Sequence, residues 1–257
     1  MLDINLKKGK TEFLVAANGK GAKEAHRELC SMPDSRLPCT IASGEVVGVL
    51  ITRFYKHMGR KTLPSGGVLP EMTARHASAK PVINKLRHTF FNKTNTERSG
   101  KLMVGNSLIL SRDLFGAGAW PILSVAEEKR LHSNLSAHFR MVLGERYVDM
   151  EEAMLSDVEL FRVHDLRPPL IFVRFARLRL SVTIALKASF ELLSLLFLSK
   201  ADKRSWLRAV ISDLEWMARV SCEYAFSAEA WFAFCLEDPP AARRLIRKAC
   251  ESKAARI

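Results

Sequence analysis

Short apolar runs near the N-terminus alternate with turn-forming residues, a pattern typical of strands. The runs 12–16 and 46–51 each predict a strand, and a brief helical pattern covers about 22–29. The run 53–59 predicts a further strand that pairs with 46–51 in a hairpin. Pro64-Ser65-Gly66-Gly67 is the clearest break in the chain and predicts a boundary there.

Beyond this break, apolar residues recur three and four positions apart, which predicts helices. The first covers about 71–91, and Pro81 is expected to kink or break it because proline lacks a backbone N–H. Capping-box sequences begin at Thr94, Ser124 and Asp149, each with a glutamate three residues later. Each of them predicts the start of a further helix.

The stretch 170–198 is apolar on nearly all sides, so a membrane span and a buried helix both have to be considered. Lys187 and Glu191 interrupt it four residues apart, where they can pair on one helix face. Because a charged pair is costly in lipid, we predict a buried central helix. Asp202 and Asp238 are expected to cap the last two helices.

These patterns predict an α+β fold class, with a small β-containing region at the N-terminus followed by a mostly α-helical remainder. We divide the chain into three regions, 1–62, 63–145 and 146–257. The last two are expected to be helical throughout.

The charge balance of the chain predicts a binding partner. The chain has 257 residues and 48% hydrophobic positions, which is enough for a sizeable core and excludes a disordered chain. Its net charge is +13. Residues 1–120 hold 19 Lys and Arg against nine Asp and Glu, whereas 121–257 are nearly balanced at 21 against 18. A polyanionic partner is therefore expected to bind the N-terminal half.

Most sequence motifs of nucleotide-binding, catalytic and metal sites are missing. Gly9-Lys10-Thr11 ends like a phosphate-binding loop, but that loop needs glycine where Ile4 stands. The sequence has no G-x-S-x-G nucleophile motif and no adjacent Asp-Asp pair. Five cysteines without a C-x-x-C pair predict buried reduced thiols and no metal site. Met1 leads into polar sequence, which favours an intracellular location, nuclear or cytoplasmic.

Four ordered blocks stand out within the first 120 residues: Leu2 to Phe13, Phe54 to Gly59, Arg75 to Ala79, and Lys101 to Trp120. Together they resemble the reverse transcriptases of non-LTR (LINE-type) retrotransposons. In turn, they are similar to that family's G-L-x-x-N-x-x-K-T-E segment, its Y-K-x-L-G primer-grip hairpin, its first thumb helix and its K-x-x-L…L-x-x-x-L-L-Y-G-x-x-x-W stretch.

The resemblance covers about residues 1–145 and implies a structural role for each of the three regions. It implies a palm remnant with a primer-grip-like hairpin, a thumb-like helical domain and a helical C-terminal extension. Met58 replaces the usual leucine of the hairpin, Phe115 stands where tyrosine is common, and Pro81 is a departure from the family. Phe115 and Trp120 are expected in the core of the thumb.

The resemblance also implies roles for individual side chains. Lys10 matches a lysine for which a general-acid role toward the departing pyrophosphate is proposed. The alternative interpretation is that Lys10 is a solvated lysine beside a strand. The other expected residues contact the primer or the phosphates of the duplex, and their alternative is ordinary packing or solvated surface. These residues are Lys7, Lys8, Phe54, Tyr55, Lys56, Gly59, Arg75, Lys80, Lys85 and Arg87.

Enzymes of this family extend DNA on an RNA template through two metal ions held by aspartates upstream of the matching segment. The sequence begins after them, so Mg²⁺ is expected as a cofactor only for the full-length enzyme. We therefore expect a truncated C-terminal portion of an RNA-directed DNA polymerase that binds an RNA/DNA primer–template duplex but does not polymerise alone. The missing N-terminal part of the polymerase is a second expected partner.

Two alternatives come from other classes of protein. One is a non-enzymatic helical interaction module, in which 170–198 docks a protein partner. The other is a basic protein associated with a membrane surface.

Overall fold

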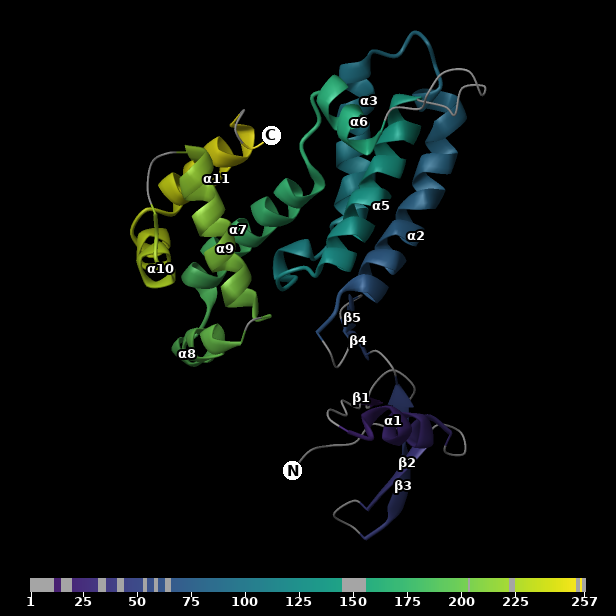
Figure 1. Cartoon of the computed structure of the whole chain (residues 1–257), viewed down its shortest axis with the longest axis vertical. Coiled ribbons are helices and arrows are strands. Elements are labelled where there is room, and N and C mark those ends of the chain that lie inside the picture. Colours follow the sequence, from purple (N-terminus) through teal and green to yellow (C-terminus); the bar gives the residue numbers. More distant parts are fainter. Residues whose placement is uncertain are drawn as a thin grey trace. The chain divides into compact units, whose positions relative to one another are not determined.

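The computed structural model describes residues 12–14, 20–31, 36–40, 44–52, 55–57, 60–62, 66–144, 156–202, 204–221, 225–252 and 255. The chain divides into two compact units, Met1–Glu71 and Met72–Ile257 (Figure 1). The predicted α+β class, with a small N-terminal sheet and a mostly helical remainder, is confirmed. The predicted region boundaries at 62/63 and 145/146 involve residues outside the description and stay predictions.

The N-terminal unit contains a three-stranded sheet in the order β1-β3-β2, in which β3 is central. β1 lies parallel to β3 and β2 lies antiparallel to it. Val47, Val49 and Ile51 of β3 are buried at alternate positions, so one face of this strand forms the core of the unit. The elements are β1 (Glu12–Leu14), α1 (Ala22–Ser31), β2 (Arg36–Thr40), β3 (Val46–Thr52), β4 (Tyr55–His57) and β5 (Arg60–Thr62).

The predicted hairpin between 46–51 and 53–59 is wrong. Both edges of β3 are occupied, one by β1 and the other by β2, so no edge remains for the following segment. β4 instead pairs with β5 in an antiparallel hairpin, with Tyr55 opposite Thr62 and His57 opposite Arg60. The sequence did not predict β2, since Pro38 within Arg36–Thr40 argues against a strand; an edge position in the sheet accommodates it.

The C-terminal unit is helical. α2 (Leu69–Leu86) continues into the π-helical turn η2 (Arg87–Phe91), and α3 (Arg98–Gly105) continues through η3 (Asn106–Leu110) into α4 (Ser111–Asp113). The remaining elements are η4 (Ala117–Ala119), α5 (Val125–Leu143), α6 (Asp157–Val163), α7 (Pro169–Lys187), α8 (Phe190–Leu198), η5 (Ser199–Ala201), α9 (Trp206–Ser221), α10 (Ala228–Glu237) and α11 (Pro239–Glu251).

α2, α3 and α5 run side by side as a bundle (Figure 1). Its core includes Ala79 and Ile83 of α2, Phe91 of η2, Ile109 of η3 and Val142 of α5, all nearly inaccessible to solvent. Residues at i and i+4 share one face of a helix, so the apolar spacing in the sequence forms this core directly. Gly105 of α3 lies against Val142, where an added Cβ would come within 3.0 Å of the valine side chain.

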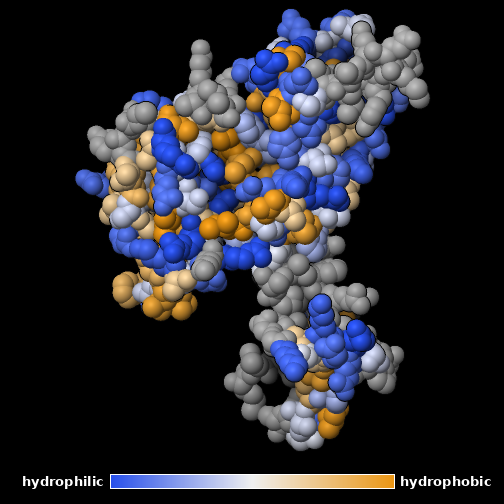
Figure 2. Space-filling view, in the orientation of Figure 1, coloured by the Kyte–Doolittle hydropathy of each residue, from blue (hydrophilic) through white to orange (hydrophobic). Residues whose placement is uncertain are grey.

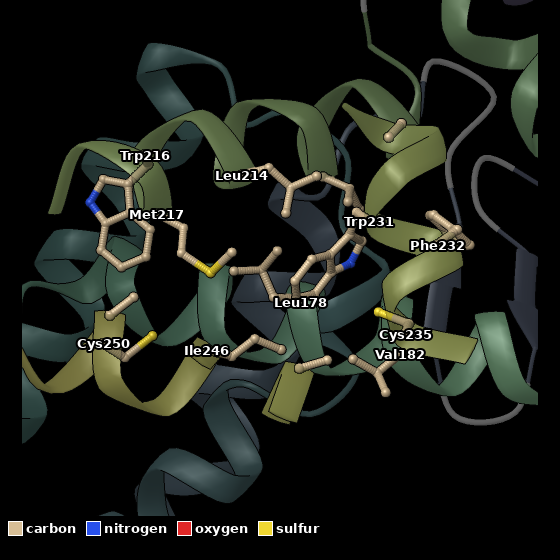
Figure 3. Packing of buried hydrophobic residues seen from close by; sticks show 14 of the residues in the cluster. Leu178, Val182, Leu214, Trp216, Met217, Trp231, Phe232, Cys235, Ile246 and Cys250 are labelled. Carbon is tan, nitrogen blue, oxygen red and sulfur yellow. The ribbon is translucent and has the colours of Figure 1, made fainter. Parts of the chain in front are cut away.

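A larger core joins α7, α9, α10 and α11 (Figure 3). Leu178 of α7, Met217 of α9, Trp231 of α10 and Ile246 of α11 are buried there. The indole Nε1 of Trp231 donates a hydrogen bond to the Ser181 hydroxyl at 2.8 Å, so the one polar atom of this large ring is satisfied.

The bundle and this larger core belong to one unit because η4 packs closely on α7. A Cβ added to Gly118 would lie 2.7 Å from the carbonyl oxygen of Ala176, so only glycine allows this approach. The indole Nε1 of Trp206 donates to the Gly118 carbonyl at 2.6 Å and joins α9 to the same point.

The predicted helix break at Pro81 does not occur, and the predicted capping box at Thr94 does not form. α2 passes through Pro81 without ending. Proline has no backbone N–H, so the carbonyl of Ala77, one turn earlier, loses its helical hydrogen bond. Pro81 and Ala77 are both exposed, so water can bind this carbonyl instead. The capping box at Thr94 is absent, because α3 starts at Arg98 with Glu97 at the N-cap and no side-chain cap.

The predicted capping box at Ser124 is confirmed: its hydroxyl accepts from the Glu127 N–H, while the Glu127 carboxylate accepts from the Ser124 N–H at 2.7 Å. The predicted start at Asp149 lies outside the described residues. A further capping box opens α6 at Ser156.

The predicted single buried helix over 170–198 is wrong in its second half. α7 ends at Lys187, and α8 starts after Ser189, whose hydroxyl accepts from the Leu192 N–H at 3.4 Å. Lys187 and Glu191 therefore lie on different helices and do not form the predicted i,i+4 pair. Among the helices of the described residues, none has the length and apolarity that a bilayer crossing needs.

The two predicted aspartate caps differ in outcome. Asp238 caps α11, since its carboxylate accepts from the Ala241 N–H at 2.9 Å. Asp202 does not cap a long helix; it follows η5 and accepts from the Arg204 N–H. The cap-like bond at the start of α9 comes from Ser205, whose hydroxyl accepts from the Arg208 N–H at 3.2 Å.

The prediction of buried free thiols is confirmed for two of the cysteines. Cys235 and Cys250 are free and lie in the larger core, and burial raises the pKa of each thiol to about 12. Both are therefore packing residues and not nucleophiles.

Candidate functional site

The bundle exposes far more basic than acidic side chains. Over residues 72–144, eight lysines and arginines are exposed, against two exposed acidic residues, Glu97 and Glu128. The other two acidic residues of this range, Asp113 and Glu127, are buried. The ratio of basic to acidic residues therefore rises from 11 to 4 in the sequence of this range to 8 to 2 among its exposed residues. Figure 2 shows hydrophilic residues over much of the bundle. The exposed basic residues are Lys80, Lys85, Arg87, Lys93, Arg98, Arg112, Lys129 and Arg130, called here the basic bundle surface.

The four residues predicted on α2 do not form one row. Steps of five residues turn a helix by about 140°, so Arg75, Lys80 and Lys85 point in three directions. Lys80 and Arg87 are seven residues apart and return to nearly the same side. Lys80, Lys85 and Arg87 are exposed, whereas Arg75 is half-buried.

Arg75 lies against Phe115, with its guanidinium carbon 4.5 Å from the centre of the ring. Phe115 is 51% exposed, so the prediction that it lies in the core is wrong, whereas Trp120 is buried as predicted. The difference arises at Gly116, whose left-handed φ of 75° turns the chain between the two aromatic residues. Arg75 and Phe115 together form a cation–π pair at the surface.

The residues predicted near the N-terminus are only partly described. Lys7, Lys8, Lys10, Phe54 and Gly59 lie outside the described residues. Tyr55 and Lys56 lie on β4, and only their backbone is described. The arrangement of Lys10 beside this hairpin stays a prediction.

A second basic strip lies on α11 and was not predicted. Arg243 and Arg247, like Arg244 and Lys248, are four residues apart, so the four exposed side chains cover one side of the helix. Three of them line a groove of about 520 Å³ beside Val220. Counting charge over half of the chain hides this strip, but the sequence R-R-L-I-R-K contains the spacing that could have shown it.

His76 of α2, Asp113 of α4 and His138 of α5 form a polar group in which Asp113 and His138 are buried and His76 is partly buried. Side-chain ligand atoms of the three residues lie within 4.8 Å of one another. His138 Nδ1 contacts Asp113 Oδ2, His76 Nδ1 lies 3.9 Å from Asp113 Oδ1, and the two imidazole rings stack with centroids 4.4 Å apart. Such a set of two imidazoles and a carboxylate can hold a divalent metal ion.

Two nitrogen atoms of this group lack hydrogen bonds. In the described part of the chain, His76 Nδ1 and His138 Nε2 are buried without a hydrogen-bond partner, whereas His138 Nδ1 and Asp113 Oδ2 contact each other. A buried polar atom without a partner costs about 1–3 kcal/mol. Burial lowers the pKa of His76; His138, Lys80 and Arg130 act in the same direction, and Asp113 opposes them.

The sequence reasoning missed this group because its members are far apart in the chain and match no local motif. The available signal was a polar residue on each apolar helix face. His76 precedes Ala79 by three residues, Asp113 follows Ile109 by four, and His138 precedes Val142 by four.

Comparison of the chain with protein-family models, curated proteins and solved structures gave no match.

Proposed function

We propose that the chain is the C-terminal portion of a non-LTR retrotransposon reverse transcriptase, and that it binds a primer–template duplex without polymerising nucleotides. The observation that carries the proposal is the basic bundle surface, with eight exposed cations against two exposed acidic residues over 72–144. This surface belongs to the segment in which the third and fourth family-like blocks lie.

The exposed cations fit a phosphate backbone better than a specific small anion. They are spread over α2, η2, the following loop, α3, α4 and α5. Contacts of this kind hold a duplex through its charge and do not read its sequence. We therefore propose affinity for RNA–DNA hybrids without sequence preference.

The binding test is a salt series with a labelled RNA–DNA hybrid, measured by fluorescence anisotropy. The affinity of the wild-type chain falls steeply as salt rises, because cations released from the phosphates drive binding. Lys80→Gln/Arg87→Gln weakens binding and reduces the slope of log affinity against log salt by about 2. An affinity independent of salt contradicts the proposal.

The matched control is Arg162→Gln/Arg208→Gln. This variant removes the same charge from two exposed positions outside the bundle, on α6 and α9. It leaves the affinity and the slope close to the wild-type values. An equal loss in both variants means that only net charge matters and contradicts a duplex site on the bundle.

The absence of polymerisation has its own measurement. Two-metal nucleotide transfer needs clustered carboxylates, and the sequence contains no adjacent Asp-Asp pair. Primer extension by the purified chain in the presence of Mg²⁺ is therefore expected to be absent. Observed extension would overturn this part of the proposal.

A helical protein-interaction module is the second candidate, favoured by α8. This helix has no buried residue, although most of its side chains are apolar. Phe190, Leu195 and Leu198 are 81%, 63% and 76% exposed. An apolar helix face of this kind is typical of a surface that contacts another protein.

A further inference from the structure

We propose that His76, Asp113 and His138 form a binding site for a divalent transition-metal ion, with zinc as the ion that fits best. The proposal concerns the framework of the helical unit and is independent of nucleic-acid binding. Two imidazole nitrogens and one carboxylate oxygen are a ligand set typical of zinc, which accepts a water molecule as its fourth ligand.

The first support is convergence. The three side chains come from α2, α4 and α5, and their ligand atoms already lie within 4.8 Å of one another. Zinc–nitrogen and zinc–oxygen bonds are about 2.0–2.2 Å long, so an ion at the centre needs only small side-chain movements.

The second support is burial without hydrogen bonds. Asp113 and His138 are 5% and 1% exposed. His138 Nδ1 and Asp113 Oδ2 contact each other, but His76 Nδ1 and His138 Nε2 have no hydrogen-bond partner among the described residues. Buried polar atoms are almost always paired, so two such nitrogens beside one buried carboxylate indicate a missing ligand. A metal ion at this group would supply such a partner.

The third support is the rigid setting. The group lies one helical turn from the core residues Ala79, Ile109 and Val142, which pack against one another. Helices held by a packed core fix their side chains more firmly than loops do, and such preorganisation favours metal binding.

The access of the group fits one open coordination position. Asp113 supplies one negative charge, which offsets part of the charge of a bound Zn²⁺. The His76 side chain is 14% exposed, so water can reach the group from this side. The site therefore holds the metal through three protein ligands and one water molecule.

The experiment uses the full chain after treatment with a chelator. Co²⁺ is added as a spectroscopic substitute for zinc, and the visible absorption of the bound ion is followed. One equivalent binds with the intense visible bands of a four-coordinate site, and Zn²⁺ displaces it. Zn²⁺ also raises the midpoint of thermal unfolding, because it binds the folded chain.

Two variants and a matched control assign the site. His76→Ala and Asp113→Asn each lower the affinity for Co²⁺ by more than the roughly 10–100-fold expected when only a hydrogen-bond partner of a metal ligand is removed. His132→Ala, the control, removes a half-buried histidine of α5 that faces a different carboxylate, Asp157, at 3.5 Å. It keeps the wild-type affinity and the Zn²⁺ effect on unfolding.

Three outcomes would overturn the site. The first is a wild-type chain that shows no visible Co²⁺ bands and no effect of Zn²⁺ on thermal unfolding. The second is a metal affinity of His76→Ala and Asp113→Asn that equals the wild-type affinity. The third is a strong near-ultraviolet sulfur band, which places the ion at cysteine. Circular dichroism verifies folding, and if Asp113→Asn fails to fold, the less buried His76→Ala decides the question.

Discussion

At the scale of single residues, the C-terminal unit compensates its buried carboxylates in different ways. Glu127 is held in a helix cap and by Arg204 at 3.1 Å, whereas Asp113 faces two histidines. Asp213 of α9 lies 3.4 Å from Arg177 and 3.6 Å from Arg174, and Arg177 is itself buried. Each arrangement offsets the cost of removing a charge from water.

The carboxyl group of Asp213 makes the free energy of unfolding depend on pH. Burial raises its pKa from 3.8 to about 6, although Arg177 and Arg174 act to lower it. A carboxyl group with a raised native pKa stabilises the fold below its unfolded pKa, and this stability is lost as pH rises through the native value. The loss between about pH 4 and pH 6 amounts to about 3 kcal/mol.

The measurement compares the free energy of unfolding of the wild type and of Asp213→Asn across this range. The difference, wild type minus variant, falls between pH 4 and pH 6 and is constant above pH 6. A carbon NMR titration of Asp213 with a midpoint below pH 4 would mean that the two guanidinium groups outweigh burial, and the prediction would be wrong.

At the scale of elements, α8 differs from the helices around it. Leu193 and Phe197 pack against the larger core, which anchors one side of the helix. The side with Phe190, Leu195 and Leu198 remains exposed, and an apolar patch is visible at this end of the unit in Figure 2. Because Ser189 starts a new helix after α7, this apolar side is turned out of the core.

If α8 is an interaction surface, two copies of the chain are the simplest pair to test. Sedimentation over a concentration series is expected to show self-association of the wild type, and Leu195→Glu/Leu198→Glu is expected to abolish it by placing charge on the apolar side. Leu236→Glu is the control, because Leu236 is 56% exposed and belongs to a different helix, α10. A monomeric wild type that binds no hydrophobic dye counts against the second candidate function.

At the scale of the whole molecule, the two compact units separate a small sheet from a large helical body. The helical unit contains both described cores, the basic bundle surface and the histidine–aspartate group. Since a unit with its own hydrophobic core can in principle fold alone, folding and duplex binding are expected to persist without the N-terminal unit.

A fragment of residues 68–257 tests this expectation and retains the whole of α2. It is expected to keep helical circular dichroism, to unfold cooperatively and to bind an RNA–DNA hybrid with a salt-dependent affinity. The affinity is lower than that of the full chain, because the fragment lacks the predicted contacts at Lys7, Lys8 and Lys56. A fragment without a cooperative transition shows that the helical unit depends on the first 67 residues.

The sequence by itself determined the features that depend on neighbouring residues. The capping box of Ser124 and Glu127, the cap at Asp238 and the apolar faces of α2 and α5 follow from spacing along one helix. A cap or a helix face involves residues within one or two turns, so the chain encodes it locally. The fold class follows from the order of the strand and helix patterns along the chain. The basic excess of the first 120 residues is a count that needs no structure.

Only the tertiary structure decided which elements meet. It placed β1 and β2 on the two edges of β3, turned Phe115 outward beneath Arg75 and left the apolar side of α8 exposed. It also brought His76, Asp113 and His138 together from three helices. Edges, exposure and convergence depend on packing between segments that are distant in sequence, and no local pattern carries that information.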